Sequence, residues 1–379
     1  MVRESLTNHE SGLAGDSGTF PAARPARPRA AISSAEGRAW RRRRGARVHD
    51  GTATGEPPGG WPSLIGHQTI DAGGLRMHIA EAGTGPLVLL LHGFPECWYS
   101  WRHQLAALAG AGFHAVAPDQ RGYCRTGRPA AVADYTILHL TGDVLALMDA
   151  LGEETAVVAG HDWGAPVAWH AALMRPDRVR GVIGLSVPYR PRGSAPPLET
   201  LRQRLGDGFY MAYFQEPGIA DAELARDLPT TFRRLLYAAS GDAPPLLPVV
   251  APGGGLLDVC PEPPFLPGWL TDGDIAVFAA EYAGTGFTGP LNWYRNLDRN
   301  WALTAPWRHA PVTVPALFLA GTRDFVVSQQ SPAQVADRLR GCVPRLAGAV
   351  LLDGCGHWTQ QERPGDVSRA IIDFLHDLG

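Results

Sequence analysis

The sequence of 379 residues contains no hydrophobic run that approaches the roughly 20 residues of a membrane-spanning helix. It also lacks a charged start followed by an apolar stretch and a cleavage site, so we expect neither a membrane protein nor a secreted one. Neither charge sign is in excess, because 34 Lys and Arg residues stand against 37 Asp and Glu residues. This balance predicts that the chain as a whole has no nucleic-acid or membrane partner.

Cysteine is scarce and scattered along the chain. The five cysteines are Cys97, Cys124, Cys260, Cys342 and Cys355. None of them forms a Cys-x-x-Cys pair or a zinc-like spacing, and no set of His with Asp or Glu has metal-ligand spacing. The sequence therefore predicts a protein of the reducing cytoplasm that binds no metal.

Hydrophobic periodicity is missing from the first 60 residues. This segment is rich in Arg, Ala, Gly and Pro, and it contains the basic run from Arg41 to Arg44. It has too little apolar surface to form a core by itself. Scattered acidic residues weaken the case for a nucleic-acid-binding or targeting segment, so residues 1–60 are predicted to form a disordered basic tail.

From residue 61 onwards, segments with strand character alternate with segments of helical spacing. Residues 69–81 are typical of a hairpin that turns at Gly73 and Gly74, and the apolar run 87–91 is typical of a strand covered on both faces. Further strands are predicted at 113–118, 156–159, 179–187, 315–320 and 350–352, and helices at 98–109, 140–151, 332–339 and 367–378. This alternation predicts an α/β fold with a mostly parallel sheet and helices on both faces.

The alternation stops between residues 189 and 311. This stretch holds Pro- and Gly-rich loops and helix-like segments at 198–214, 223–239, 274–283 and 291–303, without a convincing strand. We therefore predict a helical lid at 189–311, inserted between two parts of one core at 61–188 and 312–379. The G-x-G-x-x-G match at 284–289 follows a helix and lies in this lid, so it does not indicate a dinucleotide site.

Several predicted strands are followed by residue types that serve in nucleophilic catalysis. An aspartate flanked by small residues stands at a strand-turn-helix junction, and a second aspartate and a histidine follow two later strands. The chain order of nucleophile, orienting acid and histidine is that of the α/β-hydrolase triad, and backbone amides at two strand ends would form an oxyanion hole. The candidates are Asp162, Asp324 and His357, with the amides of Phe94 and Trp163.

His161 stands next to the candidate nucleophile, but we interpret it as a packed or hydrogen-bonded histidine. Adjacent side chains on a sharp turn diverge, which favours a base from elsewhere in the chain.

Four segments resemble the α/β-hydrolase-fold epoxide hydrolases of the soluble type, without the phosphatase domain that some of them carry: 92–101, 160–165, 287–301 and 356–360. The resemblance covers nearly everything after residue 61. It implies the fold, a helical lid, and the conversion of an epoxide and water to a vicinal diol without a cofactor. It also implies two lid tyrosines that protonate the opening ring, and the family's motifs match Tyr210 and Tyr294. Spacing alone does not separate Tyr210 from Tyr213, which lies one helical turn away.

The expected substrate-binding residues are Phe94, Trp101, Trp163 and Tyr213. The loop at 119–126 departs from the family, which usually has Gly at the position of Cys124 and Ser at that of Thr126. We therefore expect an altered conformation of this loop.

Two other functions remain as alternatives. A haloalkane or haloacid dehalogenase shares the aspartate nucleophile, but it needs halide-binding donors and does not need a tyrosine pair. A ligand receptor on the same fold without turnover would not need the complete triad. The sequence leaves open the size of the substrate, the position and handedness of ring opening, and whether the chain forms a homo-oligomer.

Overall fold

One mixed sheet organises the part of the chain that the computed structural model describes, residues 64–327 and 330–379. The predicted tail at 1–60 lies outside these residues. The strands are β1 (Gly66–Ala72), β2 (Leu75–Ala82), β3 (Leu87–Leu91), β4 (His114–Pro118), β5 (Ala156–His161), β6 (Val179–Leu185), β7 (Ala316–Gly321) and β8 (Leu346–Leu352). The core helices are η1 (Trp98–Trp101), α2 (Arg102–Gly110), η2 (Val132–Tyr135), α3 (Ile137–Leu151), α4 (Gly164–Met174), α13 (Pro332–Arg340), α14 (Thr359–Glu362) and α15 (Pro364–Asp377).

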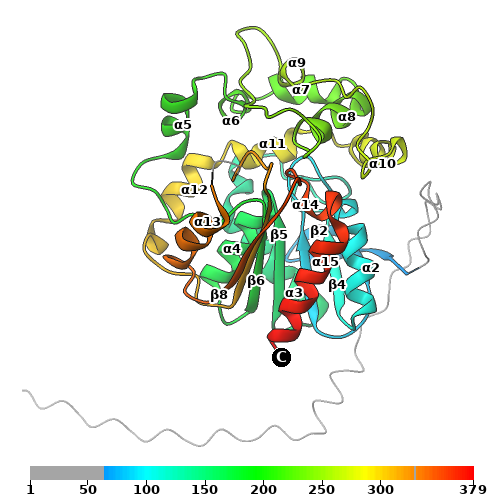
Figure 1. The fold of residues 1–379 in the computed structure, drawn as a ribbon, viewed down its shortest axis with the longest axis vertical. Coiled ribbons are helices and arrows are strands. Elements are labelled where there is room, and N and C mark those ends of the chain that lie inside the picture. The colour runs from blue at the N-terminus through cyan, green and yellow to red at the C-terminus, as the bar shows by residue number, and fades with distance from the viewer. Residues whose placement is uncertain (1–63, 328–329) are drawn as a thin grey trace, which may run out of the picture. The chain divides into compact units, whose positions relative to one another are not determined.

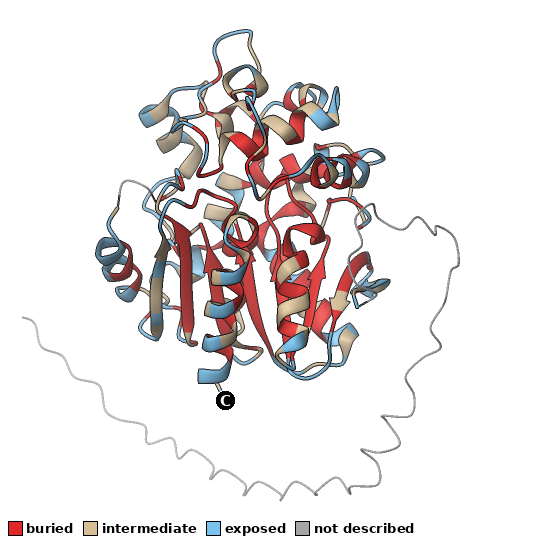
Figure 2. Ribbon diagram, turned by 45° about the vertical axis from the view of Figure 1, so that its right-hand side comes forward, coloured by how far each residue is buried: buried red, intermediate tan, exposed pale blue. Residues whose placement is uncertain are grey.

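The sheet order among the described residues is β1-β2-β4-β3-β5-β6-β7-β8. Every neighbouring pair is parallel except β1 with β2 and β2 with β4. The central strands β3, β5 and β7 are buried along their whole length, as Figure 2 shows, whereas the edge strand β8 is only partly covered. Continuous apolar sequence in the centre is what a sheet covered on both faces requires.

Helices cover both faces of this sheet (Figure 1). Helix α2 packs against α15, and α3 packs against α4. A Cβ on Gly181 of β6 would meet Phe374 of α15, whereas one on Gly184 would meet Trp169 of α4. Residues three apart on a strand point to opposite faces, so the two helix pairs lie on opposite faces of the sheet. The predicted α/β class is confirmed.

A helical lid is inserted between β6 and β7. Figure 1 shows it over the end of the sheet at which the parallel strands finish. Its helices are α5 (Pro197–Leu205), α6 (Tyr210–Tyr213), α7 (Ile219–Ala225), α8 (Leu228–Ala238), α9 (Leu256–Val259), α10 (Asp272–Tyr282), α11 (Thr288–Tyr294), α12 (Leu297–Leu303) and η3 (Ala305–Trp307). The insertion is confirmed, while the exact limits at 189 and 311 remain a prediction.

The lid helices are shorter than the sequence indicates. The segment 198–214 is interrupted at Gly206, whose φ of +83° ends α5. The segment 223–239 is interrupted at Asp227, whose side chain accepts a hydrogen bond from the Thr230 N–H and caps α8. In the core, the hairpin turn at Gly73 and Gly74 is confirmed by their positive φ angles. No helix in the described ranges is both long and apolar enough to cross a membrane.

Candidate active site

Asp162 occupies the sharp turn between β5 and α4. Its φ of +48° lies in the left-handed region, where a residue other than glycine stores strain. Glycine is required on both sides of the turn. A Cβ on Gly160 would lie 2.0 Å from the Gly164 carbonyl oxygen, and a Cβ on Gly164 would lie 2.1 Å from that of Leu91. This geometry is typical of a nucleophile raised above the end of a strand.

The loop after β3 brings a backbone amide to the Asp162 carboxylate. The Phe94 N–H donates to Oδ1 of Asp162 over 2.8 Å. Gly93 permits this approach, because a Cβ at that position would lie 2.4 Å from the same oxygen. The second candidate oxyanion donor, the Trp163 N–H, belongs to the residue that precedes α4, and the Trp163 ring packs 5.2 Å from that of Tyr294.

His357 lies between the two candidate aspartates. Its Nε2 is 3.4 Å from Oδ2 of Asp162, and its Nδ1 is 3.1 Å from Oδ1 of Asp324. Burial alone would lower the pKa of His357. The Asp324 charge, together with the hydrogen bonds and charge of the neighbouring aspartates, outweighs burial and raises this pKa well above its usual value. The resting site therefore holds a protonated histidine between two carboxylates.

Asp324 follows β7 and is fully buried. Its Oδ1 accepts the Val326 N–H over 3.0 Å in addition to facing His357. Its Oδ2 has no hydrogen-bond partner among the described residues. The carboxylate thus contacts the backbone of its own turn and the His357 ring, which suits a residue that orients an imidazole.

Glu96 is a buried carboxylate below this site that sequence reasoning did not single out. Its Oε2 accepts the Gly93 N–H over 3.1 Å and lies 2.6 Å from Nδ1 of His161. The other ring nitrogen of His161 donates to the His357 carbonyl oxygen over 2.8 Å. Glu96 and His161 therefore connect the loop that carries Phe94 to the backbone of His357.

The charge of Glu96 is stabilised inside the protein. Burial would raise its pKa, but the adjacent His161 outweighs burial and lowers the pKa to about 2. The amides of Gln360 and Gln361 donate to its Oε1 over 3.0 and 3.1 Å. The interpretation of His161 as a hydrogen-bonded residue agrees with these contacts. A lone acidic residue directly after an oxyanion loop was the signal that could have identified Glu96.

Two lid tyrosines face the candidate nucleophile. Tyr210 begins α6 and Tyr294 ends α11, and their ring centroids are 6.0 Å apart. Tyr294 also packs edge-on against Phe94 at 5.5 Å. Burial, and then the nearby Asp162 charge, raises the pKa of both phenols. Both therefore remain protonated hydrogen-bond donors at neutral pH.

Tyr213 is directed elsewhere although it shares α6 with Tyr210. Its hydroxyl donates to Oε2 of Glu223 over 2.7 Å, and Oε1 of that glutamate accepts the Leu257 N–H. After burial, the Glu223 hydrogen bond and charge raise the pKa of Tyr213, whereas Asp162 acts on the pKa of Tyr210. The structure thus brings Tyr210 to the triad and ties Tyr213 to the lid interior.

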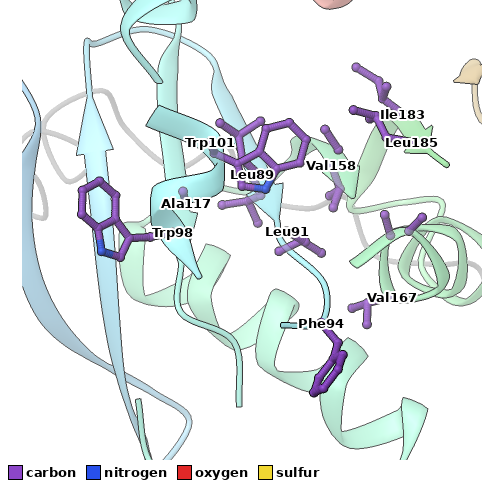
Figure 3. Close-up of a cluster of buried hydrophobic side chains, with 14 of the residues drawn as sticks. Leu89, Leu91, Phe94, Trp98, Trp101, Ala117, Val158, Val167, Ile183 and Leu185 are labelled. Atoms are coloured by element: carbon purple, nitrogen blue, oxygen red, sulfur yellow. The ribbon is translucent and has the colours of Figure 1, made fainter. Parts of the chain in front are cut away.

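The structure does not bring Trp101, which we expect to bind substrate, into the candidate site. Its side chain is fully buried, and Figure 3 shows it in the core cluster beside Leu89 and Val158, away from Phe94. The short helix η1 directs this ring into the sheet packing, because Trp98 to Trp101 are all buried. Trp101 is a core residue, while Phe94 and Trp163 line the site through their contacts with Tyr294.

Comparisons with known proteins place this geometry in a family context. Residues 86–246 match the family described as the alpha/beta hydrolase fold. The chain is 48% identical over 315 residues to Epoxide hydrolase A of Mycobacterium tuberculosis, covering 82% of this chain and 97% of that protein. It is 44% identical to Epoxide hydrolase 3 of Siraitia grosvenorii, covering 82% of this chain and 98% of that one.

Solved structures agree with the sequence relatives. An epoxide hydrolase from an endophytic Streptomyces superimposes with a TM-score of 0.79 at 46% identity, covering 84% of this chain and 97% of that one. Epoxide Hydrolase A from Mycobacterium thermoresistibile gives a TM-score of 0.77 at 48% identity, covering 82% of this chain and 98% of that one.

Proposed function

Because the chain belongs to the epoxide hydrolases of the α/β-hydrolase fold, which add water to an epoxide and give a vicinal diol, we propose that Asp162 is the nucleophile of this reaction. One observation carries the proposal. The Asp162 carboxylate lies 2.8 Å from the Phe94 amide and 3.4 Å from the His357 ring. Two protonated phenols, those of Tyr210 and Tyr294, lie on the lid beside it.

In the first step, Oδ2 of Asp162 attacks a ring carbon of the epoxide and forms an alkyl ester. The carbon–oxygen bond of the ring breaks, and its electron pair stays on the oxygen. Tyr210 and Tyr294 donate hydrogen bonds to this oxygen, and one phenol transfers its proton to it. Because the pKa of both phenols is raised, neither loses its proton before that charge develops.

In the second step, Nε2 of His357 removes a proton from water, and the water oxygen attacks Cγ of the ester. Ester formation has removed the Asp162 charge, which is one of the influences that raise the pKa of His357, so the ring first gives up the proton that it held in the resting site, and this proton passes to the phenolate left by the first step. Negative charge develops on Oδ1, where the Phe94 N–H already lies. The Trp163 N–H is the second donor, and each donor is worth about 3 kcal/mol of transition-state stabilisation.

Collapse of the tetrahedral intermediate completes the cycle. The diol oxygen leaves with the proton held by His357, and one oxygen of the Asp162 carboxyl group now comes from water. The proton left on that carboxyl group passes to His357 and restores the protonated ring of the resting site. All steps use groups of this chain, and the only other reactants are the epoxide and water.

A single turnover in heavy-oxygen water tests the ester route. A panel of small aliphatic, styrene-type and fatty epoxides first identifies a substrate, and excess enzyme then converts it once. We expect the label in the Asp162 carboxylate, located by peptide mass mapping, and an unlabelled first diol. Label that enters this diol directly would exclude the ester. The Asp162→Ala variant is the matched control and should form neither diol nor labelled peptide.

The setting of the enzyme is also part of the proposal. We infer a cytoplasmic location from five cysteines that are all free, all of them within the described ranges. The near balance of charges supports a protein without a nucleic-acid or membrane partner. Its substrate partners are a small-molecule epoxide, of a size that the panel would determine, and water.

A further inference from the structure

Two cysteines lie side by side on the loops that flank the active site. Cys97 follows the loop after β3 that carries Phe94, and Cys124 lies in the loop after β4. Both side chains are buried. Their sulfur atoms and a carboxylate oxygen of Asp119 all lie within 4.8 Å of one another.

Cys124 adopts a backbone conformation that favours glycine. Its φ of +44° makes it one of three non-glycine residues with positive φ in the described ranges, and another of them is Asp162. Strain of this kind is kept where the surrounding structure over-determines it, often at functional positions. Glycine would adopt the same backbone without strain, so packing of the loop alone does not call for a cysteine.

Two carboxylates hold the residues that follow the cysteines. Asp119 accepts the Trp98 N–H through Oδ1 over 3.0 Å and the Arg125 N–H through Oδ2 over 3.5 Å. From the lid, Glu281 of α10 accepts the Trp98 indole N–H over 3.3 Å and pairs with the Arg125 guanidinium over 2.5 and 2.9 Å. We call these two carboxylates the clamp. Because it binds the residue after each cysteine, it keeps the two thiols together.

We propose that Cys97 and Cys124 form a redox-sensitive pair that closes to a disulfide under oxidation and slows the enzyme. A metal ion would need Asp119 as a further ligand. The oxygens of Asp119 already accept hydrogen bonds from Trp98 and from Nδ1 of His78, which lies 2.7 Å away. A disulfide needs only the two sulfurs.

Hydrogen peroxide is an oxidant that balances this chemistry. The thiolate of one cysteine attacks the peroxide, forms a sulfenic acid and releases water. The second thiol displaces water from the sulfenic sulfur, which closes the S–S bond. The pair loses two hydrogen atoms and two electrons, and the peroxide is reduced to two waters.

While the clamp holds the two loops together, the buried cysteine pair is slow to react. Burial raises the pKa of the Cys97 thiol to about 11 and that of the Cys124 thiol well above its usual value. The thiolate is the reactive form, so oxidation requires opening of the loops or the lid. An S–S bond is about 2.05 Å long, so the sulfurs must also move towards each other when it closes. Loosening the clamp with Glu281→Gln should therefore speed the reaction.

The disulfide acts on the site through the loop of the oxyanion donor. Cys97 lies three residues after Phe94, whose N–H contacts Asp162, so a shift of Cys97 moves that amide. Misplacement of a catalytic group by about 1 Å can cost roughly a hundredfold in rate, and we expect the part of the shift that reaches the Phe94 amide to lower kcat by roughly tenfold.

Peptide mapping of the peroxide-treated full-length protein tests the link without any assay of activity. Remaining thiols are blocked with N-ethylmaleimide in denaturant, and the protein is digested with and without reductant. We expect a Cys97–Cys124 linked peptide that reductant separates, formed faster in Glu281→Gln. Cys342 is partly exposed and serves as an internal control for oxidation. If Cys342 is oxidised while Cys97 and Cys124 are both still free thiols that react with N-ethylmaleimide, the proposal is overturned. Separate oxidation of either cysteine without the link would overturn it as well.

The effect on turnover rests on the proposed function and is measured separately. The oxidised protein should lose diol formation by roughly tenfold and regain it with dithiothreitol. Cys124→Gly, which suits the backbone and removes the pair, should keep its rate through the same treatment. If the Cys97–Cys124 disulfide forms but the rate of diol formation does not change, the proposed slowing of the enzyme is overturned. An enzyme that forms no diol in either state would refute the function instead, and the mapped link would still stand.

Discussion

The sheet and the lid hold their candidate catalytic groups in different ways. On the sheet, Asp162 and Asp324 are each held by a backbone N–H, at 2.8 and 3.0 Å. On the lid, Tyr210 and Tyr294 are placed mainly by ring packing, including their contacts with Phe214 at 5.5 and 5.0 Å. Directional hydrogen bonds fix the nucleophile, whereas ring contacts allow small adjustments of the acids.

Because of this difference, the sheet carries the steps that are the same for every substrate, and the lid carries the step that depends on the shape of the substrate. Attack and hydrolysis occur at fixed atoms of the sheet. Ring opening needs a phenol to reach the epoxide oxygen, whose position changes with the substrate. We therefore expect changes on the sheet to affect turnover of all epoxides alike, and changes on the lid to affect epoxides unequally.

Replacement of the base should have the largest effect. His357→Gln removes the group that activates water, while Asp162 and the lid tyrosines remain. We expect steady diol formation to fall by roughly 10³ to 10⁴. Mass spectrometry of the intact protein should show an adduct of one substrate molecule, because the ester still forms. A variant that is inactive without an adduct would place His357 before ester formation and contradict the assigned order.

Replacement of a lid phenol should have the next largest effect. Tyr210→Phe and Tyr294→Phe each remove one donor to the epoxide oxygen and should slow ester formation by roughly 10- to 100-fold. Stopped-flow fluorescence of the site tryptophans measures this step. Tyr213→Phe is the matched control, because its hydroxyl is bound to Glu223, and it should keep the rate. A larger loss from Tyr213→Phe than from Tyr210→Phe would reverse the assignment.

The Glu96 network should have a moderate effect that appears mainly in stability. Glu96→Gln removes the charge that pairs with buried His161, and we expect the unfolding free energy to fall by about 3 kcal/mol at neutral pH. The effect on turnover should be smaller than the effect on stability: Phe94 and His357 shift slightly, and we expect kcat to fall by roughly three- to tenfold. Urea unfolding and steady-state kinetics on one preparation measure both.

The pH dependence of that effect has a defined sign. The pKa of Glu96 is lowered from 4.5 to about 2 in the folded protein, so its contribution is complete above pH 4.5 and declines as the pH falls towards 2. The difference in unfolding free energy between the wild type and Glu96→Gln should therefore shrink as the pH falls below 4.5. A constant difference would show that the lost contribution is packing and not charge.

Trp101 should have the smallest effect on catalysis. Trp101→Phe leaves a gap in the core and should lower the unfolding free energy by about 1 to 2 kcal/mol, partly offset because the indole N–H has no partner among the described residues. We expect kcat and KM within about twofold of the wild type for all epoxides. A change in KM that differs between small and bulky epoxides would return Trp101 to the substrate site.

Most strands and turns of the core could be predicted from local sequence patterns. The apolar run at 87–91 has the same bounds as β3, because five consecutive apolar residues suit a strand that is covered on both faces. The turn around Asp162 was also predictable, because its flanking glycines are required by backbone contacts within a few residues and by the end of β3. The chain order of the triad then followed from residue types at strand ends.

The features that escaped prediction depend on distant partners. The choice between Tyr210 and Tyr213 rests on Glu223 of α7, and the role of Glu96 rests on His161, 65 residues away. Trp101 follows the oxyanion loop closely in sequence, which suggested a binding role, but η1 turns its ring into the core. Side-chain direction in short helices and loops is set by tertiary packing, and one sequence does not reveal it.

The point of insertion of the lid has a practical meaning for protein engineering. The lid leaves the core after β6 and returns at β7, and these strands are hydrogen-bonded neighbours, as in the pairing of Val182 with Ala316. Both junctions are therefore anchored on one pair of hydrogen-bonded strands, so the core alone fixes where the lid begins and ends. The lid can be treated as a replaceable cassette, so transplanting it from a relative should transfer substrate range while the recipient keeps its own reaction.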